Sequence, residues 1–452
     1  MPTVSLAPWQ WLTSRLPQVA SAPFCPSEVQ GSIRVPPGAP LWKRAALSAG
    51  PGLLVAVGYM DPGNWATDIE AGSRFGYDLL FVVGGTGLAA LLLQALAMRL
   101  GLVTGRDLAQ MAHDHYPRPA RLVLWLLAEL AIVATDIAEV LGAALAFHLL
   151  IGVPLWAGVV LTGFDTLIVL GLKGHGFRQV EAIVLGLVTT IAVCFVAQLA
   201  LVHPDWHAVA HGMIPAPRRL GDHEALYLAI GILGATVMPH NLYLHSSAVQ
   251  TRRGGTTQAD LTDQLRLAGL DTTVSLALAT LVNGAILVVA GAAFHATGHT
   301  DVAQIDDAWR LLTPITGAGA AAMLFGIALF ASGQSATFTG TIAGQVVLEG
   351  FLDLKIPCWQ RRVITRGLAL VPALAGLMWT GDRAVGTLLV FSQVVLSLQL
   401  PFAIWPLLRF TGNRAIMGRH ASGPVMQALG WALFALISAA NLWLVWGWLV
   451  PA

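Results

Sequence analysis

Charged residues are scarce in this sequence. Only 11% of the 452 residues are charged, against roughly 25% in soluble domains, whereas 56% are hydrophobic and the mean hydropathy is +0.70. This composition excludes a water-soluble enzyme of this length and a disordered scaffold, which needs high charge and low hydrophobicity. Because 25 Lys and Arg residues nearly balance 24 Asp and Glu residues, the chain also lacks the basic field expected of a nucleic-acid-binding protein.

Cysteines and enzyme motifs are equally sparse. Cys25, Cys194 and Cys358 are too few and too widely spaced for a disulfide framework or a thiolate zinc site. The sequence has no HExxH, no CxxC, no histidines at zinc-ligand spacing and no credible nucleophile–base pair, so it offers no support for an enzyme or for a resident cofactor. Short segments of alternating polarity, which mark a membrane β-barrel, are missing as well. The sequence therefore predicts an all-α integral membrane protein.

Long uncharged stretches predict where the chain crosses the bilayer, since about 20 apolar residues span the hydrocarbon core. We expect eleven transmembrane helices. The expected segments are Ala45–Gly76, Leu79–Met98, Leu122–Leu150, a helix that starts after the break at Gly152-Val153-Pro154, Ala182–Val202, Ala225–Thr251, Thr272–Thr300, one helix within Leu311–Leu348, Gly367–Thr380, Ala384–Leu408 and His420–Ala452. The ninth is the shortest, and we expect its flanking arginines to snorkel to the interface.

The distribution of basic residues orients these helices. With the N-terminus inside, 20 of the 25 Lys and Arg residues fall in inner segments and 5 in outer loops, as the positive-inside rule requires. We therefore expect a multi-pass cell-membrane protein with a cytoplasmic N-terminus and an extracytoplasmic C-terminus. Residues 1–44 are rich in proline and lack the apolar core of a signal peptide, which favours a disordered cytoplasmic tail. The lipid bilayer is the expected environment, and the sequence indicates no obligatory protein partner.

Two of the expected helices contain a proline near their middle. The first holds Asp61-Pro62-Gly63-Asn64, and the sixth holds Met238-Pro239-His240-Asn241. Proline removes a backbone donor and clashes with the preceding turn, so each helix should split at mid-membrane, where unpaired backbone is tolerated only if it is buried or lines a wet cavity. One such proline usually means only a kink, but these two occur at equivalent points, five crossings apart, in helices of opposite direction.

This spacing indicates an inverted repeat. We expect the first repeat at residues 45–203 and the second at 204–410, followed by an inner loop and the last helix at 411–452. Broken helices at a repeat interface place the substrate site of a secondary transporter near the bilayer midplane.

The residues at the two breaks indicate a cation site. Asp61 offers a carboxylate, Asn64 an amide oxygen and Met238 a thioether sulfur, and unwinding frees backbone carbonyls near Gly58 and Ala235. Hard ions such as Mg²⁺ and Ca²⁺ prefer oxygen ligands, whereas a thioether favours softer transition ions. A membrane methionine usually serves packing, but beside an intramembrane aspartate we interpret it as a filter that admits Mn²⁺ or Fe²⁺.

A second group of ionisable residues lies on the third helix. Glu129, Asp136 and Glu139 fall within roughly an 80° arc of a helix, and carboxylates at membrane depth are costly enough to suggest a function. The alternative is that they partner structural arginines, which fits Glu129 best because it lies near an interface.

Histidines and arginines elsewhere could complete a proton path. His240 and His245 follow the second break, and an imidazole suits proton handling. A lone membrane histidine is more often a hydrogen-bonded core residue, and His240 is the better candidate because it lies two residues from Met238. Arg361 and Arg362 precede the ninth helix and could balance the carboxylates or act only as topology signals.

Four separated stretches resemble the Nramp family (natural resistance-associated macrophage proteins), which are proton-coupled divalent metal transporters. The similar stretches are Asp61–Tyr77, Ala134–Glu139, Gly234–His245 and Ser392–Ser397, and the likeness covers about residues 45–450. The resemblance implies a leucine-transporter-like fold, with Met238 separating the chain from magnesium- and aluminium-transporting relatives. It favours a compact prokaryotic manganese transporter.

The resemblance also assigns residues to roles. It implies that the metal is bound by Asp61, Asn64, Met238 and the carbonyl of Gly58 or Ala235, with Gln393 as a ligand in some conformations. The proton-handling residues that it implies are Asp61, His240, Asp136, Glu139, Arg361 and Arg362.

Two other functions compete with this interpretation. A cation-coupled amino-acid carrier of the same fold needs helix N-termini that are free for the substrate carboxylate, and Asp61 argues against that arrangement. A membrane receptor built on a degenerate transporter core would have lost its ligand residues and gained a large soluble output domain. Neither change is present in the sequence.

Overall fold

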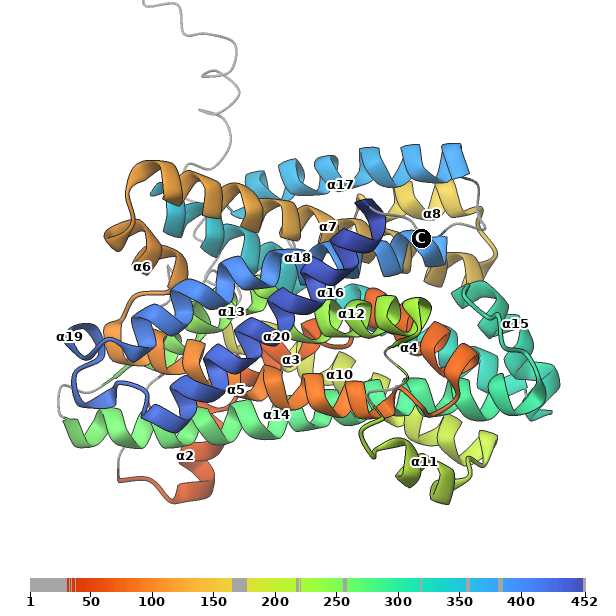
Figure 1. The fold of residues 1–452 in the computed structure, drawn as a ribbon, viewed down its shortest axis with the longest axis horizontal. Coiled ribbons are helices and arrows are strands. Elements are labelled where there is room, and N and C mark those ends of the chain that lie inside the picture. The colour runs from red at the N-terminus through yellow and green to blue at the C-terminus, as the bar shows by residue number, and fades with distance from the viewer. Residues whose placement is uncertain are drawn as a thin grey trace, which may run out of the picture.

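The computed structural model describes residues 31–449 except 32, 34, 37, 165–176, 217, 218, 220, 255–257, 318, 355–357 and 381–384. All regular elements in these ranges are helices, most of them stacked along one long axis (Figure 1). The α-helices are α2 (Leu41–Ser48), α3 (Pro51–Gly58), α4 (Pro62–Phe75), α5 (Leu80–Thr104), α6 (Leu108–His115), α7 (Arg118–Ile151), α8 (Leu155–Thr162), α10 (Phe177–Val202), α11 (Trp206–Gly212), α12 (His223–Val237), α13 (Pro239–Ala248), α14 (Gln258–Ala293), α15 (Ile305–Thr316), α16 (Gly319–Leu352), α17 (Cys358–Thr380), α18 (Val385–Gly412), α19 (Arg414–Met417) and α20 (Pro424–Leu449). Short 3-10 turns follow α13 (η3, Val249–Arg252), α14 (η4, His295–Thr297) and α19 (η6, Gly418–His420).

Eight helical segments of the described chain are long and apolar enough to cross a membrane. They are α5, α7, α10, α12 with α13 and η3, α14, α16, α18 and α20. The first predicted span corresponds to the short pair α3 and α4, the fourth begins with α8, and the ninth corresponds to α17, whose apolar part is Val363–Trp379. The all-helical membrane architecture is confirmed, and the number eleven stays a prediction.

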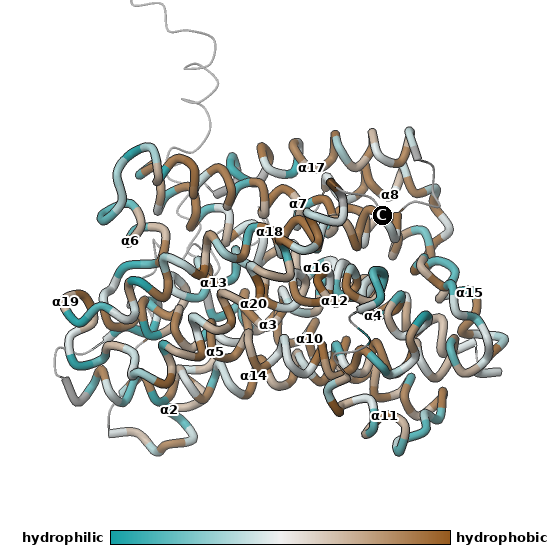
Figure 2. Tube along the Cα trace, viewed as in Figure 1, coloured by the Kyte–Doolittle hydropathy of each residue, from teal (hydrophilic) through white to brown (hydrophobic). Residues whose placement is uncertain are grey.

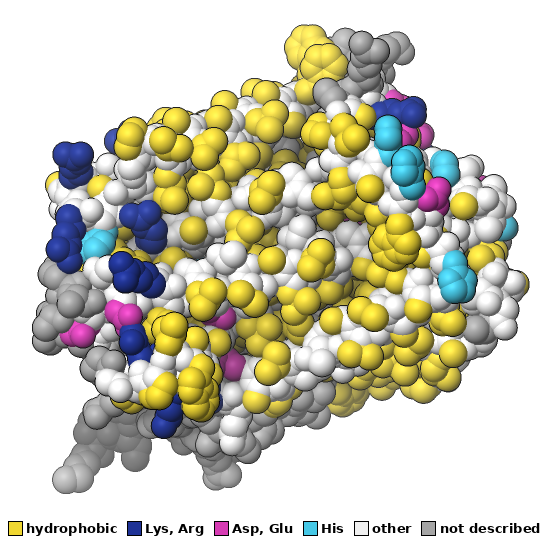
Figure 3. Space-filling model, turned by 90° about the horizontal axis from the view of Figure 1, so that it is seen from below, with side chains coloured by type: hydrophobic (Ala, Val, Ile, Leu, Met, Phe, Trp, Pro, Cys, Tyr) yellow, Lys and Arg dark blue, Asp and Glu magenta, His cyan; other side chains and the backbone are white. Residues whose placement is uncertain are grey.

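Polar residues gather at the two ends of the bundle. Figure 2 shows brown, apolar segments through the middle and teal segments near α6 and α19 at one end and near α11 and α15 at the other. On the face in Figure 3, most Lys and Arg side chains lie at the α19 end, and most of the histidines lie at the opposite end. An apolar girdle between two polar ends matches a bilayer-spanning protein.

Both proline breaks form where the sequence predicts them. α3 ends at Gly58 and α4 starts at Pro62, while α12 ends at Val237 and α13 starts at Pro239. Each proline takes the first position of the following half-helix, where its missing N–H costs nothing. Met238 has φ 24° and ψ 108°, a conformation that L-residues rarely adopt and that the surrounding packing must hold in place.

Glycines let the neighbouring helices approach the first break closely. A Cβ atom on Gly72 of α4 would lie 2.5 Å from the Leu287 carbonyl of α14, and one on Gly52 of α3 would lie 2.8 Å from the Thr272 nitrogen. On α7, Gly142 packs directly on Pro62. Small residues bring membrane helices together in this way, and here they fix both halves of the broken helix on α14.

This packing predicts the effect of one added methyl group. Gly72→Ala should lower the stability of the protein by about 1–3 kcal/mol, because the new carbon meets backbone that cannot move aside. Gly186→Ala is the matched control, since the space beside Gly186 of α10 is open. Thermal unfolding in detergent measures both variants. Equal melting temperatures for the two would contradict the backbone contact between α4 and α14.

Candidate cation site

The first break and α18 bring together oxygen atoms that have no protein partner among the described residues. Asp61 accepts a hydrogen bond from the Asn64 backbone nitrogen through Oδ1 (2.8 Å), but its Oδ2 has no hydrogen-bond partner in the described part of the chain. The same is true of Asn64 Oδ1 and of Gln393 Oε1. All three side chains are at most 1% exposed. A buried acceptor without a partner is costly, so three of them together suggest a ligand.

Gln393 comes from α18 and packs on the first break. A side-chain carbon on Gly63 would overlap the Gln393 amide, and the Gln393 Nε2 donates to Ser392 Oγ at 2.9 Å. One hydrogen of the amide nitrogen is therefore engaged, while the amide oxygen has no partner in the described part of the chain. No spacing pattern pointed to Gln393, which the family resemblance alone implied.

At the second break, Met238 is fully buried and its sulfur lies 3.6 Å from Asn241 Nδ2. Asn241 also contacts the position where Gly58 would carry a side chain, so this amide connects the two breaks. Asn241 was not among the site residues predicted from the sequence. A signal was present, because Asn241 follows Met238 by three residues just as Asn64 follows Asp61.

The unwound carbonyls differ in how they are used. The Tyr59 carbonyl accepts a hydrogen bond from Asn64 Nδ2, and the Met60 carbonyl accepts one from Trp65 Nε1 at 3.2 Å. Among the described residues, the Gly58 carbonyl accepts only a long bond of 3.4 Å from the Asp61 nitrogen. Gly58 thus keeps more accepting capacity than the next two residues. Ala235, whose carbonyl is the other predicted backbone ligand, lies fully buried in the last turn of α12.

The cluster suits a cation that accepts mixed ligands. It offers one carboxylate, amide oxygens and a thioether, and the described residues contain no group of three or more His, Cys, Asp or Glu side chains that could hold a metal. An all-carboxylate or all-thiolate metal centre therefore finds no support in these ranges. A sulfur among oxygens favours a transition ion over Ca²⁺ or Mg²⁺.

The predicted acidic stripe lies on α7 and packs against α16. Glu139 is fully buried and Asp136 nearly so. A Cβ on Gly340 of α16 would lie 2.7 Å from Glu139 Oε1 and 3.4 Å from Asp136 Oδ1. His240 reaches the same helix, since its Nδ1 lies 3.4 Å from Thr135 Oγ1, next to Asp136. The structure thus places His240 between Met238 and the acidic stripe.

The arginines of α17 contradict our expectation that they snorkel. α17 begins at Cys358, and its Arg361 and Arg366 are buried against α7 instead of reaching the interface. One Arg361 nitrogen lies 2.7 Å from both oxygens of Glu129, and Arg366 lies 4.0 Å from Glu139 and donates to Thr337 at 3.1 Å. Each guanidinium is buried next to a carboxylate, which takes the place of water as its partner. The side chain of Arg362 lies outside the described residues.

Arg366 is the residue of this group that the sequence did not reveal, because the ninth helix was expected to begin only at Gly367, one residue later. His245, in contrast, lies apart from the stripe. Its Nδ1 is 3.0 Å from Gln94 Oε1 and its Nε2 is 3.4 Å from Thr272 Oγ1, while Gln94 donates to the Tyr59 hydroxyl at 2.9 Å. His245 therefore belongs to a separate chain of polar groups between α5, α13 and α14.

The fold and the site together define a secondary transporter of the leucine-transporter-like class. Mhp1 in its inward-facing conformation aligns with a TM-score of 0.56 and 14% identity over 88% of both chains. MhsT in complex with L-phenylalanine aligns with a TM-score of 0.57 and 14% identity, covering 87% of this chain and 97% of its own. At these identities the likeness shows the fold alone.

Closer similarities define the family. Residues 52–447 match the family described as natural resistance-associated macrophage protein-like. The divalent metal cation transporter MntH of Ralstonia nicotianae is 64% identical over 95% of this chain and 98% of its own length, and MntH 1 of Pseudomonas aeruginosa is 62% identical over 96% and 99%. A crystal structure of a mutant manganese transporter from Eremococcus coleocola aligns with a TM-score of 0.87 and 36% identity, over 94% of this chain and 92% of that one. The chain belongs to the Nramp family.

The buried thioether makes a prediction about selectivity. Met238→Ala should keep some Mn²⁺ uptake but lose discrimination against Ca²⁺, because only the sulfur distinguishes the two ions. A tenfold loss of selectivity corresponds to about 1.4 kcal/mol. Competition of Ca²⁺ with Mn²⁺ uptake in proteoliposomes measures it, with Met98→Ala on α5 as a buried methionine away from the breaks. If Ca²⁺ competes no better in Met238→Ala, the methionine serves packing alone.

Proposed function

We propose that this chain imports divalent transition-metal ions, Mn²⁺ and also Fe²⁺, by symport with protons through alternating access. The observation that carries the proposal is the set of buried oxygens of Asp61, Asn64 and Gln393 that have no partner among the described residues, together with the buried Met238 at the second break. The names of the relatives support it, since two are divalent metal cation transporters and a third is a manganese transporter. The ions are substrates, and the proposal includes no resident cofactor.

A route for protons follows from the residues beside the metal ligands. A carboxylate that binds a divalent ion must lose its proton, so metal arriving at Asp61 displaces one. His240 lies beside the second break and reaches α7 next to Asp136. From there the carboxylates of Asp136 and Glu139 continue the path, and Arg366 and Arg361 stand along it. We propose that the proton moves along α7 and away from the metal.

Alternating access requires the contacts at the inner end to separate. In this structure Arg252 of η3 pairs with Glu181 of α10 at 2.6 Å, and the Asp271 carboxylate of α14 accepts from Gly52 N at 2.7 Å and from Gly50 N at 3.2 Å. The Asp271 bonds tie the start of α3 to α14, the Arg252–Glu181 pair ties η3 to α10, and Arg252 also donates to the Ala49 carbonyl at 2.8 Å, just before α3. With the metal ligands at most 1% exposed, the site is closed to solvent, and we propose that inward opening breaks this group of contacts.

The proposal includes a direction. The basic end of the molecule in Figure 3 would face the cytoplasm. The N-terminus would then lie on the cytoplasmic side of the cell membrane and the C-terminus on the outer side. Metal would then enter from the end that holds α11 and α15.

Asp61→Ala tests the site assignment. It removes the only carboxylate within the two breaks, so Mn²⁺ uptake by proteoliposomes should fall to background while the protein stays folded. Asp114→Ala, which removes a half-exposed carboxylate 3.6 Å from Arg106, should leave uptake intact. Uptake near the wild-type rate in Asp61→Ala would contradict the assignment of Asp61 to the metal site.

Glu139→Gln tests the proton route. An inward proton gradient should accelerate Mn²⁺ uptake by the wild type and acidify the vesicle interior. The variant should lose much of this coupling while its metal affinity changes little, since glutamine keeps the shape but cannot titrate. Internal pH and metal flux are recorded together, with Glu224→Gln as an exposed control. Mn²⁺ entry without acidification in the wild type would refute symport, and unchanged coupling in Glu139→Gln would remove that residue from the route.

A further inference from the structure

Asp68 is a buried carboxylate that belongs neither to the two helix breaks nor to the acidic stripe on α7. It lies on α4, seven residues after Asp61. Seven residues advance a helix by about 10 Å and return to within about 20° of the same face. Asp68 therefore lies two turns beyond Asp61 on the same side of α4, toward the end of the molecule that holds α11 and α15.

The surroundings of Asp68 leave both of its oxygens without a partner. The side chain is 1% exposed, and neither carboxylate oxygen has a hydrogen-bond or ion-pair partner among the residues that the structure describes. Glu70, two residues later, behaves differently: it pairs with Arg74 at 3.2 Å, and Arg74 also binds Glu224. An isolated buried carboxylate needs a counter-charge or a proton. Asp68 is therefore suited to bind either a cation or a proton.

The neighbouring helix presents a second free oxygen at the same level. Asn283 of α14 is 1% exposed and its Oδ1 has no partner within the described ranges. Gly52 lies against Thr272, and Gly72 lies against Leu287 and Ala290, so α14 runs in the same direction as the broken helix. Asp68 is one turn before Gly72, and Asn283 is one turn before Leu287 on the face that packs against α4. Asp68 and Asn283 thus lie at the same height along two parallel helices, on the faces by which these helices pack together.

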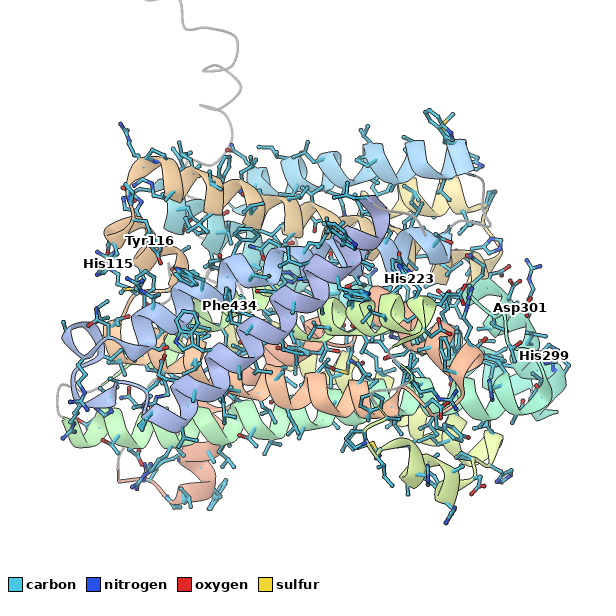
Figure 4. The ribbon with its side chains drawn as sticks, viewed as in Figure 1. His115, Tyr116, His223, His299, Asp301 and Phe434 are labelled. Carbon is cyan, nitrogen blue, oxygen red and sulfur yellow. The ribbon has the colours of Figure 1, made fainter. Side chains whose placement is uncertain are left out.

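Above this level the outer end of α4 is covered. Ser73 Oγ accepts from the Val302 backbone nitrogen at 2.9 Å and donates to the His299 carbonyl at 3.3 Å. Figure 4 shows His299 and Asp301 at this end, beside α15. Asp68 and Asn283 therefore lie between the outer cover and the metal ligands.

From this geometry we infer that Asp68 and Asn283 form a second, outer station for a divalent cation on its way to Asp61. The inference rests on the proposed function, because it assumes that a divalent ion passes along α4. The station supplies oxygen ligands only, two from the carboxylate and one from the amide. Oxygen ligands accept Ca²⁺ and Mg²⁺ as readily as Mn²⁺. The outer station therefore collects divalent ions, and selection occurs afterwards, at Met238.

Direct binding of Mn²⁺ alone tests the station apart from transport. Purified full-length Asp61→Ala, in which the inner site is disabled, should still bind Mn²⁺ weakly in equilibrium dialysis with radioactive metal, and Ca²⁺ should displace it at similar concentrations. Adding Asp68→Asn should weaken this residual binding at least tenfold. Adding Glu70→Gln instead is the matched control and should leave it unchanged. Absence of residual binding in Asp61→Ala, or equal binding with and without Asp68→Asn, would overturn the inference.

A second variant separates a ligand from a residue that only supports the fold. Asn283→Asp, made in the Asp61→Ala background, places a second carboxylate at the station and should tighten Mn²⁺ binding several-fold, which a purely structural role does not predict. In otherwise wild-type protein, Asp68→Asn should raise the KM for Mn²⁺ uptake several-fold with little loss of maximal rate. An unchanged KM together with unchanged binding in Asn283→Asp would rule the station out. Failure of the wild type to carry Mn²⁺ would instead defeat the proposed function, and the binding results would still stand.

Discussion

The interior of a bilayer offers no water to a backbone amide or carbonyl, so a broken membrane helix must satisfy its own loose ends. The first break does this with its own side chains. Asp61 Oδ1 caps α4, Pro62 has no N–H to satisfy, and the carbonyls of Tyr59 and Met60 accept from Asn64 and Trp65. The candidate cation site depends on this arrangement, because Asp61 and Asn64 stabilise the break and also present oxygens without a partner in the described ranges.

Satisfying the break engages one hydrogen of each amide and leaves acceptor oxygens without a partner among the described residues. Asn64 donates through Nδ2 and keeps Oδ1, Gln393 donates through Nε2 and keeps Oε1, and Asp61 keeps Oδ2. Buried oxygen lone pairs without a hydrogen-bond donor attract a positive ligand. The negative charge of Asp61 repels an anionic substrate from the same place.

The features that were predictable from sequence are those set by neighbouring residues. Proline positions located both breaks, and apolar runs located the helices, because chain geometry and hydrophobic length act locally. Residues whose role depends on packing between distant helices were missed or misjudged. Asn241 reaches from one break to the other, and Arg366 belongs to α17, which was expected to begin only at Gly367. Asp68 lies within the Asp61–Tyr77 stretch but received no role of its own. The burial of Arg361 and Arg366 likewise needed the position of α7, which no local pattern contains.

The arrangement of ionisable groups also explains how one protein can move two cations through one site. A proton and a divalent ion on the same path would repel each other strongly in a medium of low dielectric constant. Here Asp61 and Met238 lie between two different polar groupings. His240, Asp136 and Glu139 run along α7, backed by the arginines of α17, whereas Gln94, His245 and Thr272 lie on the side of α5 and α14. Arginines beside the acidic stripe disfavour a divalent ion there but still permit a carboxylate to exchange a proton. Charge placement along α7 and α17 can therefore separate the two cations after they meet at Asp61.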